Sequence, residues 1–141
     1  MPSLRITHGT WDELQQAAKM IREQVFIQEQ NIAAEDEWDE QDEIAVHFVV
    51  YEQDQAIATA RLLQNHSIGR VAVLKSHRGL GVGKVLMQAV IAYAQQQQHP
   101  FLVLSSQVHA QAFYQALGFM QEGEEYLDCG IPHIHMRFVL S

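Results

Sequence analysis

The pattern of apolar positions near the start of the chain predicts an amphipathic helix. Apolar residues recur at intervals of three or four from Leu14 to Val25, which places them on one face of a helix. Thr10 and Glu13 precede most of this run with the spacing of a capping box, in which each side chain bonds the backbone of the other residue. We therefore expect a first helix over residues 11–27, followed by an acidic stretch of loop or irregular helix.

The middle of the chain alternates short β-rich runs with turn residues. A polar turn, Glu-Gln-Asp-Gln, separates the first two runs and predicts a hairpin. Apolar residues from Val82 to Tyr93 return to helical spacing, and this second helix stops by Pro100, since the residue before a proline disfavours helical backbone. The expected strands are residues 45–51, 56–63 and 68–74.

The last third of the chain predicts a buried strand, a short helix and a closing hairpin. The run 101–105 is short and continuously apolar, as expected of a strand covered on both faces. A helix over residues 109–117 ends at Gly118, a residue suited to the left-handed conformation just after a helix. The closing hairpin is expected over residues 119–127 and 133–140, around the turn Asp128-Cys129-Gly130.

This order of elements predicts an α/β fold with a mixed central β-sheet flanked by helices. The N-terminal strands are expected to pair antiparallel, and the last two strands form the C-terminal hairpin. A helix connects strand 68–74 with strand 101–105, so these two strands are expected to pair parallel. With 141 residues, 48% of them hydrophobic, the chain is expected to form a single domain over residues 1–141.

Composition excludes several classes of protein. The charged fraction of 18% is far below that of a disordered chain, and no apolar run approaches the roughly 20 residues that span a bilayer. The N-terminus lacks the apolar segment of a signal peptide. The one cysteine, Cys129, allows no internal disulfide and no CxxC zinc site, and is expected to be an inert turn residue. We expect a cytoplasmic protein with no membrane partner.

Charge is distributed unevenly along the chain. Seven of the 17 acidic residues lie between Glu35 and Glu43, and four of the nine basic residues lie between Arg70 and Lys84. The acidic and basic poles suit one cationic and one anionic ligand, or are simply solvated surfaces. The net charge of −8 and the short basic cluster argue against a nucleic-acid partner.

Three glycines, Gly79, Gly81 and Gly83, stand between a predicted strand and the start of a helix. Free backbone N–H groups and the positive end of the helix dipole suit such a loop to a phosphate, and Arg78 and Lys84 add positive charge. A Walker A loop is excluded, because arginine and valine stand where it needs a glycine and a hydroxyl residue. The dinucleotide-binding motif G-x-G-x-x-G is also excluded, because Lys84 stands where its last glycine is needed. The loop reads R-x-x-G-x-G instead.

This R-x-x-G-x-G loop, together with the later F-Y-x-x-x-G-F segment from Phe113 to Phe119, resembles the GNAT superfamily of acyl-CoA-dependent N-acyltransferases. The two motifs lie in the family's order and at about its separation. Further segments are similar to the ElaA-like branch of the superfamily, so the resemblance covers nearly the whole chain. These segments are Arg22–Gln30, Glu37–Asp42, His47, Arg61 and Gly130–Arg137.

The resemblance implies a GNAT fold and an enzyme that transfers an acetyl group from acetyl-CoA to a primary amine, by direct attack in a ternary complex. The parallel central strands would splay apart to admit the thioester. The backbone of Val71 and Val73 would pair with the pantetheine arm, and a backbone N–H near Val73 would stabilise the oxyanion. The residues that would hold the pyrophosphate are Arg78, Gly79, Leu80, Gly81, Val82, Gly83 and Lys84.

The resemblance also implies that Tyr114 is the general acid that protonates the leaving thiolate. Periodicity alone equally favours a core aromatic residue on a short helix. Gln107, at the end of a strand beside the cleft, is a candidate contact for the cofactor or substrate. No metal is expected, because His133 and His135 share one face of a strand without an evident third ligand. His135 is also an alternative general base.

The general base is expected in the acidic segment. A primary amine is mostly protonated at neutral pH and must lose a proton before it attacks. We select Glu37 as the catalytic carboxylate, with Asp39 and Asp42 as alternatives, and a solvated acidic loop as the plainer interpretation. For two more residues the sequence leaves open a substrate contact or a buried ion pair, namely His47 and Arg61.

A hypothesis from another class is a non-catalytic acetyl-CoA sensor or partner-binding module, which would use the same loop. For the enzyme, the expected acceptor is the amine of a small molecule or a peptide, and the acidic segment favours a cationic one. GNAT proteins often form dimers, so a homodimer is also an expectation.

Overall fold

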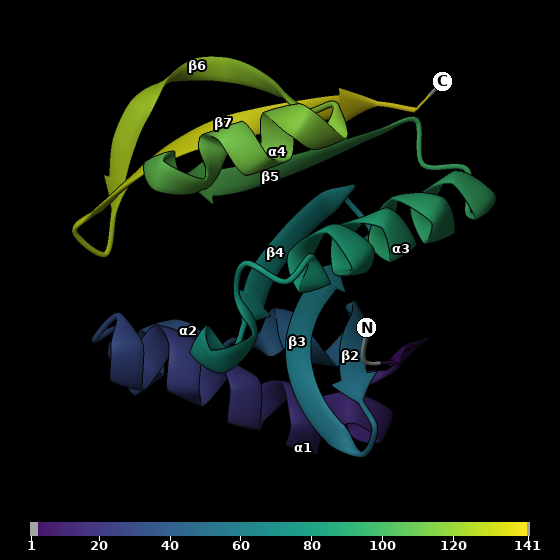
Figure 1. The fold of residues 1–141 in the computed structure, drawn as a ribbon. Helices are drawn as coiled ribbons and strands as arrows, with labels where there is room; N and C mark the ends of the chain where they lie inside the picture. Colours follow the sequence, from purple (N-terminus) through teal and green to yellow (C-terminus); the bar gives the residue numbers. More distant parts are fainter. Residues whose placement is uncertain (1–2, 141) are drawn as a thin grey trace.

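The computed structural model describes residues 3–140 and, within them, one seven-stranded sheet in the order β1-β2-β3-β4-β5-β7-β6 (Figure 1). The strands are β1 (Leu4–Gly9), β2 (Val46–Glu52), β3 (Gln55–Leu62), β4 (Ser67–Val73), β5 (Phe101–Gln107), β6 (Met120–Asp128) and β7 (Ile131–Val139). The helical segments are α1 (Trp11–Arg22), the π-helix η1 (Glu23–Glu29), α2 (Ala34–Glu37), η2 (Glu40–Glu43), η3 (Lys75–His77), α3 (Val82–Gln96), η4 (Val108–Ala110) and α4 (Gln111–Leu117).

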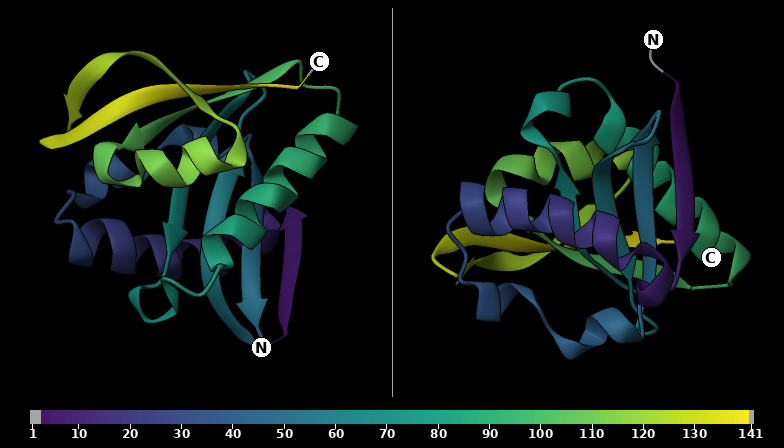
Figure 2. Two further views of the ribbon diagram at one scale, coloured as in Figure 1. Left: turned by 45° about the horizontal axis from the view of Figure 1, so that its top comes forward. Right: turned by 90° about the horizontal axis from the view of Figure 1, so that it is seen from below.

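The helices cover both faces of the sheet (Figure 2). α1 packs on one face of β2 and β3, and α3 packs on the opposite face of the same strands. Because helices cover it from both sides, β3 is buried along nearly its whole length. The predicted α/β fold with a mixed sheet is confirmed. Large apolar side chains that are fully buried in the core include Ile21, Phe48, Ile57, Leu86, Leu102, Phe119 and Met136.

β4 and β5 form the predicted parallel pair, and the other neighbouring strands of the sheet pair antiparallel. The parallel pairing is short. It joins Ser67 with Val103 and Ile68 with Leu104, and α3 supplies the crossover between the two strands. Beyond these pairs the two strands separate, as Figure 1 shows. The expectation of a splayed central pair is therefore confirmed.

A bulge in β4 gives the physical reason for this separation. Along β3, Arg61 pairs with Gly69 whereas Thr59 pairs with Ala72, so β4 has one residue more than its partner over this stretch. Arg70 lies inside the bulge with a left-handed φ of 52°. A bulge bends the strand that carries it and increases its twist. β4 therefore turns away from β5 directly after the last parallel pair.

β1 is an element that the sequence did not predict. Residues 4–9 pair antiparallel with β2 along their whole length, at the edge of the sheet. Only Leu4 and Ile6 supply apolar side chains at alternating positions, and so short a run gives no clear period-two signal. The pairing with β2, rather than the local pattern, defines this strand.

The first helix begins as predicted and then changes type. In the capping box, the backbone N–H of Glu13 donates to Oγ1 of Thr10 at 3.3 Å, and the backbone N–H of Thr10 donates to Oε1 of Glu13 at 2.9 Å. From Glu23 the chain widens into η1, which ends with the Gln30 N–H donating to the carbonyl of Val25 at 3.2 Å. The acidic stretch that follows forms the short helices α2 and η2, in line with the expectation of loop or irregular helix.

The remaining elements follow the predicted order. The hairpin β2–β3, the strand β4, helix α3, strand β5 and the hairpin β6–β7 are confirmed with small shifts at their ends. The helix expected over 109–117 forms from Gln111, after the 3₁₀ turn η4, and Gly118 ends it with a left-handed φ of 113°. Among the described residues, none of the helices combines the length and apolar character needed to cross a membrane.

Candidate functional site

An open backbone edge lies between β4 and β5 beyond their last parallel pair. β5 pairs with β7 on its other side from Phe101 to Gln107, and β4 pairs with β3. Val71 and Val73 lie in the part of β4 that has no register partner on β5, and both are half-buried. An extended ligand can bind at such an edge by adding backbone hydrogen bonds, in the manner of an extra strand.

The glycine loop leads from this edge into α3. Gly81 is the N-cap of α3 with a left-handed φ of 84°, a conformation in which any residue with a β-carbon is strained. No side chain caps the first turn of this 15-residue helix. Its N–H groups at the positive end of the helix dipole therefore suit an anion. The loop from Arg78 to Gly81 is exposed, and so is Lys84.

Gly83 allows the first turn of α3 to pack closely against two neighbouring segments. A β-carbon at this position would lie 3.2 Å from Cζ of Phe113 and 3.8 Å from Cγ2 of Val73. The first distance is tighter than an ordinary van der Waals contact, so the Phe113 ring would have to shift by a few tenths of an ångström to admit a larger residue. The end of β4, the glycine loop and the F-Y segment of α4, which the sequence selected separately, thus meet at Gly83.

Tyr114 is buried on α4, with 8% of its surface exposed. Its ring packs edge-to-face against Phe113, with ring centroids 5.0 Å apart, and against Phe119 at 5.9 Å. Burial raises the pKa of the Tyr114 phenol well above its ordinary value of 10.0. The hydroxyl is therefore protonated at neutral pH, as a general acid must be.

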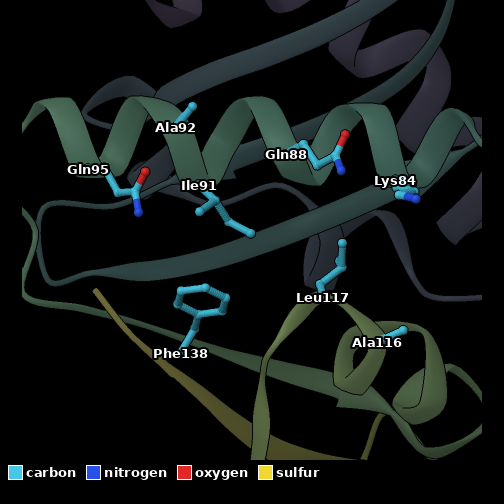
Figure 3. Close-up of a pocket in the computed structure, with 8 residues that line it drawn as sticks. All are labelled: Lys84, Gln88, Ile91, Ala92, Gln95, Ala116, Leu117 and Phe138. Carbon is cyan, nitrogen blue, oxygen red and sulfur yellow. The ribbon is translucent and has the colours of Figure 1, made fainter. Parts of the chain in front are cut away.

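A hollow of about 300 Å³ lies along α3 (Figure 3). Lys84 lines it near the first turn of α3, with Gln88 and Gln95 further along the same helix. Leu117 of α4 and Phe138 of β7 form the facing wall. Lys84, the residue after Gly83, therefore lines a groove of mixed polar and apolar character between α3 and α4.

Arg78, expected at the pyrophosphate, bonds two protein groups in this structure. Its Nη1 and Nη2 atoms donate to the two carboxylate oxygens of Glu29 at 2.5 and 2.8 Å. Its Nε donates to the carbonyl of Val73 at 3.0 Å. Gln107, the other predicted contact, donates from Nε2 to Oε1 of Gln30 at 3.0 Å.

The acidic segment is attached to α1 through one buried arginine. Arg22 donates from Nε to Glu37 at 2.6 Å and from Nη1 to Asp42 at 2.7 Å. All three residues are at most 2% exposed. Burial raises the pKa of the Glu37 carboxyl, and the positive charges of Arg70 and Arg22 oppose that rise. The selected catalytic carboxylate is thus a buried ion-pair partner.

The same segment also contacts the bulge of β4 through Arg70. Arg70 donates from Nη2 to the Glu37 carbonyl at 3.0 Å, and its Nε lies 3.2 Å from the Glu37 carboxylate. Arg61 donates to Asp39 at 2.7 Å and to Asp42 at 2.8 Å, and the Arg61 guanidinium lowers the pKa of Asp39. Of the alternatives left open for Arg61, the structure places it in a buried ion pair.

His47 is buried beside this network and donates from Nε2 to the Asp42 carbonyl at 2.8 Å. Burial lowers the pKa of His47 below its ordinary value of 6.5. His47 therefore binds a proton more readily in the unfolded chain than in the folded protein. The free energy of unfolding consequently decreases as pH falls below about 6.5. Between pH 7.5 and 5.5 we expect His47 to contribute a loss of at most about 1.4 kcal/mol in the free energy of unfolding.

Urea denaturation at the two pH values measures this loss, with His47→Gln as the matched variant. Glutamine retains a donor near the position of Nε2 but does not titrate, so the variant should lose less stability between pH 7.5 and 5.5. An identical loss in both proteins would contradict the assignment to His47.

The sequence singled out His133 and His135 on β7, but it missed their polar neighbours on β5 and β6, Ser105 and Tyr126. The hydroxyl groups of Tyr126 and Ser105 are hydrogen-bonded, and the Tyr126 ring stacks on His135 with centroids 4.6 Å apart. His133 donates from Nδ1 to the Ile131 carbonyl at 2.7 Å. The pairing of β5, β6 and β7 brings Ser105 and Tyr126 to these histidines, and no local motif marks the two hydroxyl residues. Among the described residues, no three His, Cys, Asp or Glu side chains form a group that could hold a metal ion.

Comparison with known proteins identifies the class. Residues 12–140 match the acetyltransferase (GNAT) domain, and the chain belongs to this family. GNAT enzymes use acyl-CoA and act on amine acceptors. The resemblance to GNAT proteins found in the sequence is thus confirmed.

Relatives also support the narrower resemblance. The chain is 38% identical over 120 residues to the uncharacterized N-acetyltransferase YjcF of Bacillus subtilis, covering 82% of this chain and 86% of that one. The crystal structure of Escherichia coli ElaA matches with a TM-score of 0.88 and 30% identity over 96% of this chain and 99% of that one. An acyl-CoA N-acyltransferase from Pseudomonas aeruginosa matches with a TM-score of 0.87 and 32% identity over 97% and 100%.

Proposed function

We propose that this protein transfers an acetyl group from acetyl-CoA to a primary amine by direct attack in a ternary complex. The observation that carries the proposal is the open edge of β4, which leads into an uncapped helix N-terminus through the glycine loop. An extended pantetheine arm would pair with the backbone of Val71 and Val73. The pyrophosphate would lie on the N–H groups of the loop from Arg78 to Lys84.

In the proposed reaction, the neutral amine nitrogen attacks the thioester carbonyl carbon. The new C–N bond forms and the C–S bond breaks, after a backbone N–H near Val73 has stabilised the oxyanion. Tyr114 donates its proton to the departing sulfur and regains one from solvent. Burial keeps the phenol protonated, and the Tyr114 ring packs on Phe113, whose Cζ would lie 3.2 Å from a β-carbon at Gly83 of the loop; both observations support this role.

The attacking amine must also lose a proton to a base. Glu37 is the base that the sequence selected, but the residue is 2% exposed and its carboxylate lies close to Arg22 and Arg70. A general base must contact its substrate. The contact of Glu37 with Arg70 instead fixes the β4 bulge, which separates β4 from β5. We therefore favour a positioning role for Glu37 and retain His135, which is exposed, as the alternative base.

The proposed acceptor is a cationic amine of a small molecule or peptide. Glu37, Asp39 and Asp42 are occupied by arginines, so the attraction would come from the exposed acids of the same segment. Among them are Glu35, Glu40 and Glu43. A cytoplasmic location and a homodimer remain predictions.

Calorimetric titration with acetyl-CoA, CoA and ATP, followed by thiol release in the presence of a panel of amines, tests this function. We expect micromolar binding of acetyl-CoA and thiol release that depends on the amine. Binding without release from any amine would favour the non-catalytic sensor. A preference for ATP, or no binding of CoA, would exclude the proposed cofactor site.

A further inference from the structure

The last turn of η1 touches both walls of the splayed cleft through two adjacent residues. Glu29 accepts both hydrogen bonds from the guanidinium of Arg78, in the loop that follows β4. Gln30 accepts a hydrogen bond from Gln107, the last residue of β5. The two residues thus link the β4 side of the cleft to the β5 side, and we call them the η1 bracket.

The contact between Glu29 and Arg78 engages groups that the proposed cofactor would bind. The guanidinium of Arg78 bonds the Val73 carbonyl through Nε and the Glu29 carboxylate through both terminal nitrogens. A diphosphate would compete with the carboxylate for the same planar set of donors, because both anions bind arginine in the same bidentate way. A pantetheine amide would likewise compete for the Val73 carbonyl.

The contact is suited to exchange rather than to permanent structure. The side chains of Arg78 and Glu29 are 40% and 34% exposed, so solvent screens their attraction. The Arg78 guanidinium lowers the pKa of Glu29, which is therefore charged at neutral pH. η1 is a π-helix, a form that is rare and is frequently found at functional sites.

We propose that Glu29 is a displaceable counter-ion of Arg78 that is exchanged for the diphosphate of CoA, an inference that rests on the proposed function. When the cofactor binds, Arg78 moves from the carboxylate to the phosphates and Glu29 is released. Cofactor binding is thereby coupled to η1 and to the segment that follows it. Glu29 acts as a positioning residue for the cofactor and does not take part in the chemistry.

The test compares the wild-type protein with Glu29→Gln and with a matched control, Glu23→Gln. Both glutamates lie on η1 and are exposed, but the Glu23 side chain accepts a hydrogen bond from Gln28, at 3.4 Å, where Glu29 accepts from Arg78. Because an exposed ion pair contributes little to stability, all three proteins should fold. Calorimetry measures the Kd of acetyl-CoA and of S-acetylpantetheine, which carries the thioester without the diphosphate.

We expect Glu29→Gln to bind acetyl-CoA roughly two- to fivefold more tightly than wild type, the range set by a partly exposed ion pair. Its affinity for S-acetylpantetheine should be unchanged, and Glu23→Gln should match wild type for both ligands. Hydrogen exchange adds a second measurement. Acetyl-CoA should increase exchange of the amides of residues 29–32 in wild type, whereas Glu29→Gln should exchange fast there without ligand.

Three results would overturn the proposal. Equal acetyl-CoA affinity in wild type and Glu29→Gln would show that Glu29 does not compete with the diphosphate. Equal tightening for acetyl-CoA and S-acetylpantetheine would show a general loosening of the cleft. If none of the three proteins bound acetyl-CoA, the proposed function itself would fail, and this inference with it.

Discussion

Replacing Tyr114 with phenylalanine is expected to lower kcat at least about 100-fold, because general acid catalysis typically contributes 100- to 10,000-fold. The thiolate would then leave without a proton donor. The affinity for acetyl-CoA should change little, since the phenylalanine ring keeps the packing against Phe113 and Phe119. Steady-state thiol release and calorimetry on the same preparations measure the two quantities.

Tyr93→Phe is the matched control for this substitution. Tyr93 lies on α3, and its ring packs against Phe48 and His8 rather than against the F-Y segment. The control therefore removes one tyrosine hydroxyl without changing the F-Y segment. It should retain wild-type kcat. Full kcat in Tyr114→Phe would assign Tyr114 to the core alone, the alternative that periodicity left open.

The raised pKa of Tyr114 adds a prediction about alkaline pH. Since burial holds the phenol protonated beyond its ordinary range, the acid should not be lost between pH 7 and 10. kcat of the wild-type enzyme should therefore show no fall from this group over that interval. A fall that is absent in Tyr114→Phe would contradict the assignment.

Asp42→Asn is expected to lower the free energy of unfolding by about 3 kcal/mol, the low end of the range for breaking a buried ion pair. Asp42 is 2% exposed and binds both Arg22 and Arg61. Removing its charge leaves two buried guanidinium groups with one carboxylate each, Glu37 and Asp39. That remaining compensation places the loss at the low end.

Urea denaturation at pH 7.5 measures the loss, with Glu43→Gln as the control. Glu43 lies in the same acidic segment but is exposed, so its substitution should change stability by less than about 0.5 kcal/mol. Equal stability of the two variants would show that the segment is a solvated surface rather than part of the buried framework. A selective loss in Asp42→Asn would support the positioning role that we favour for Glu37.

Patterns within short stretches determined much of this fold. Helical spacing and the capping box located the start of α1. The three glycines located the point where the glycine loop joins α3. These features depend on backbone conformation and on contacts between residues a few positions apart, so the sequence contains them directly. The order of strands and the connecting helix then required the parallel pair β4–β5.

Local pattern also had clear limits. β1 carries too few apolar residues to be recognised without its partner strand, and the π-helical form of η1 has the same apolar spacing as an α-helix. The β4 bulge is visible only as a shift of register against β3. Each of these features is defined by hydrogen bonds whose partners the local pattern does not specify.

The partners of the charged residues were decided by tertiary structure alone. Glu37 was selected as the catalytic base, yet its carboxylate forms a buried ion pair with Arg22, 15 residues away. Arg78 was selected for a phosphate, yet in this structure it binds Glu29, 49 residues away. A sequence records which charges are present, but their electrostatic energies depend on distance and burial, and only the folded chain sets these.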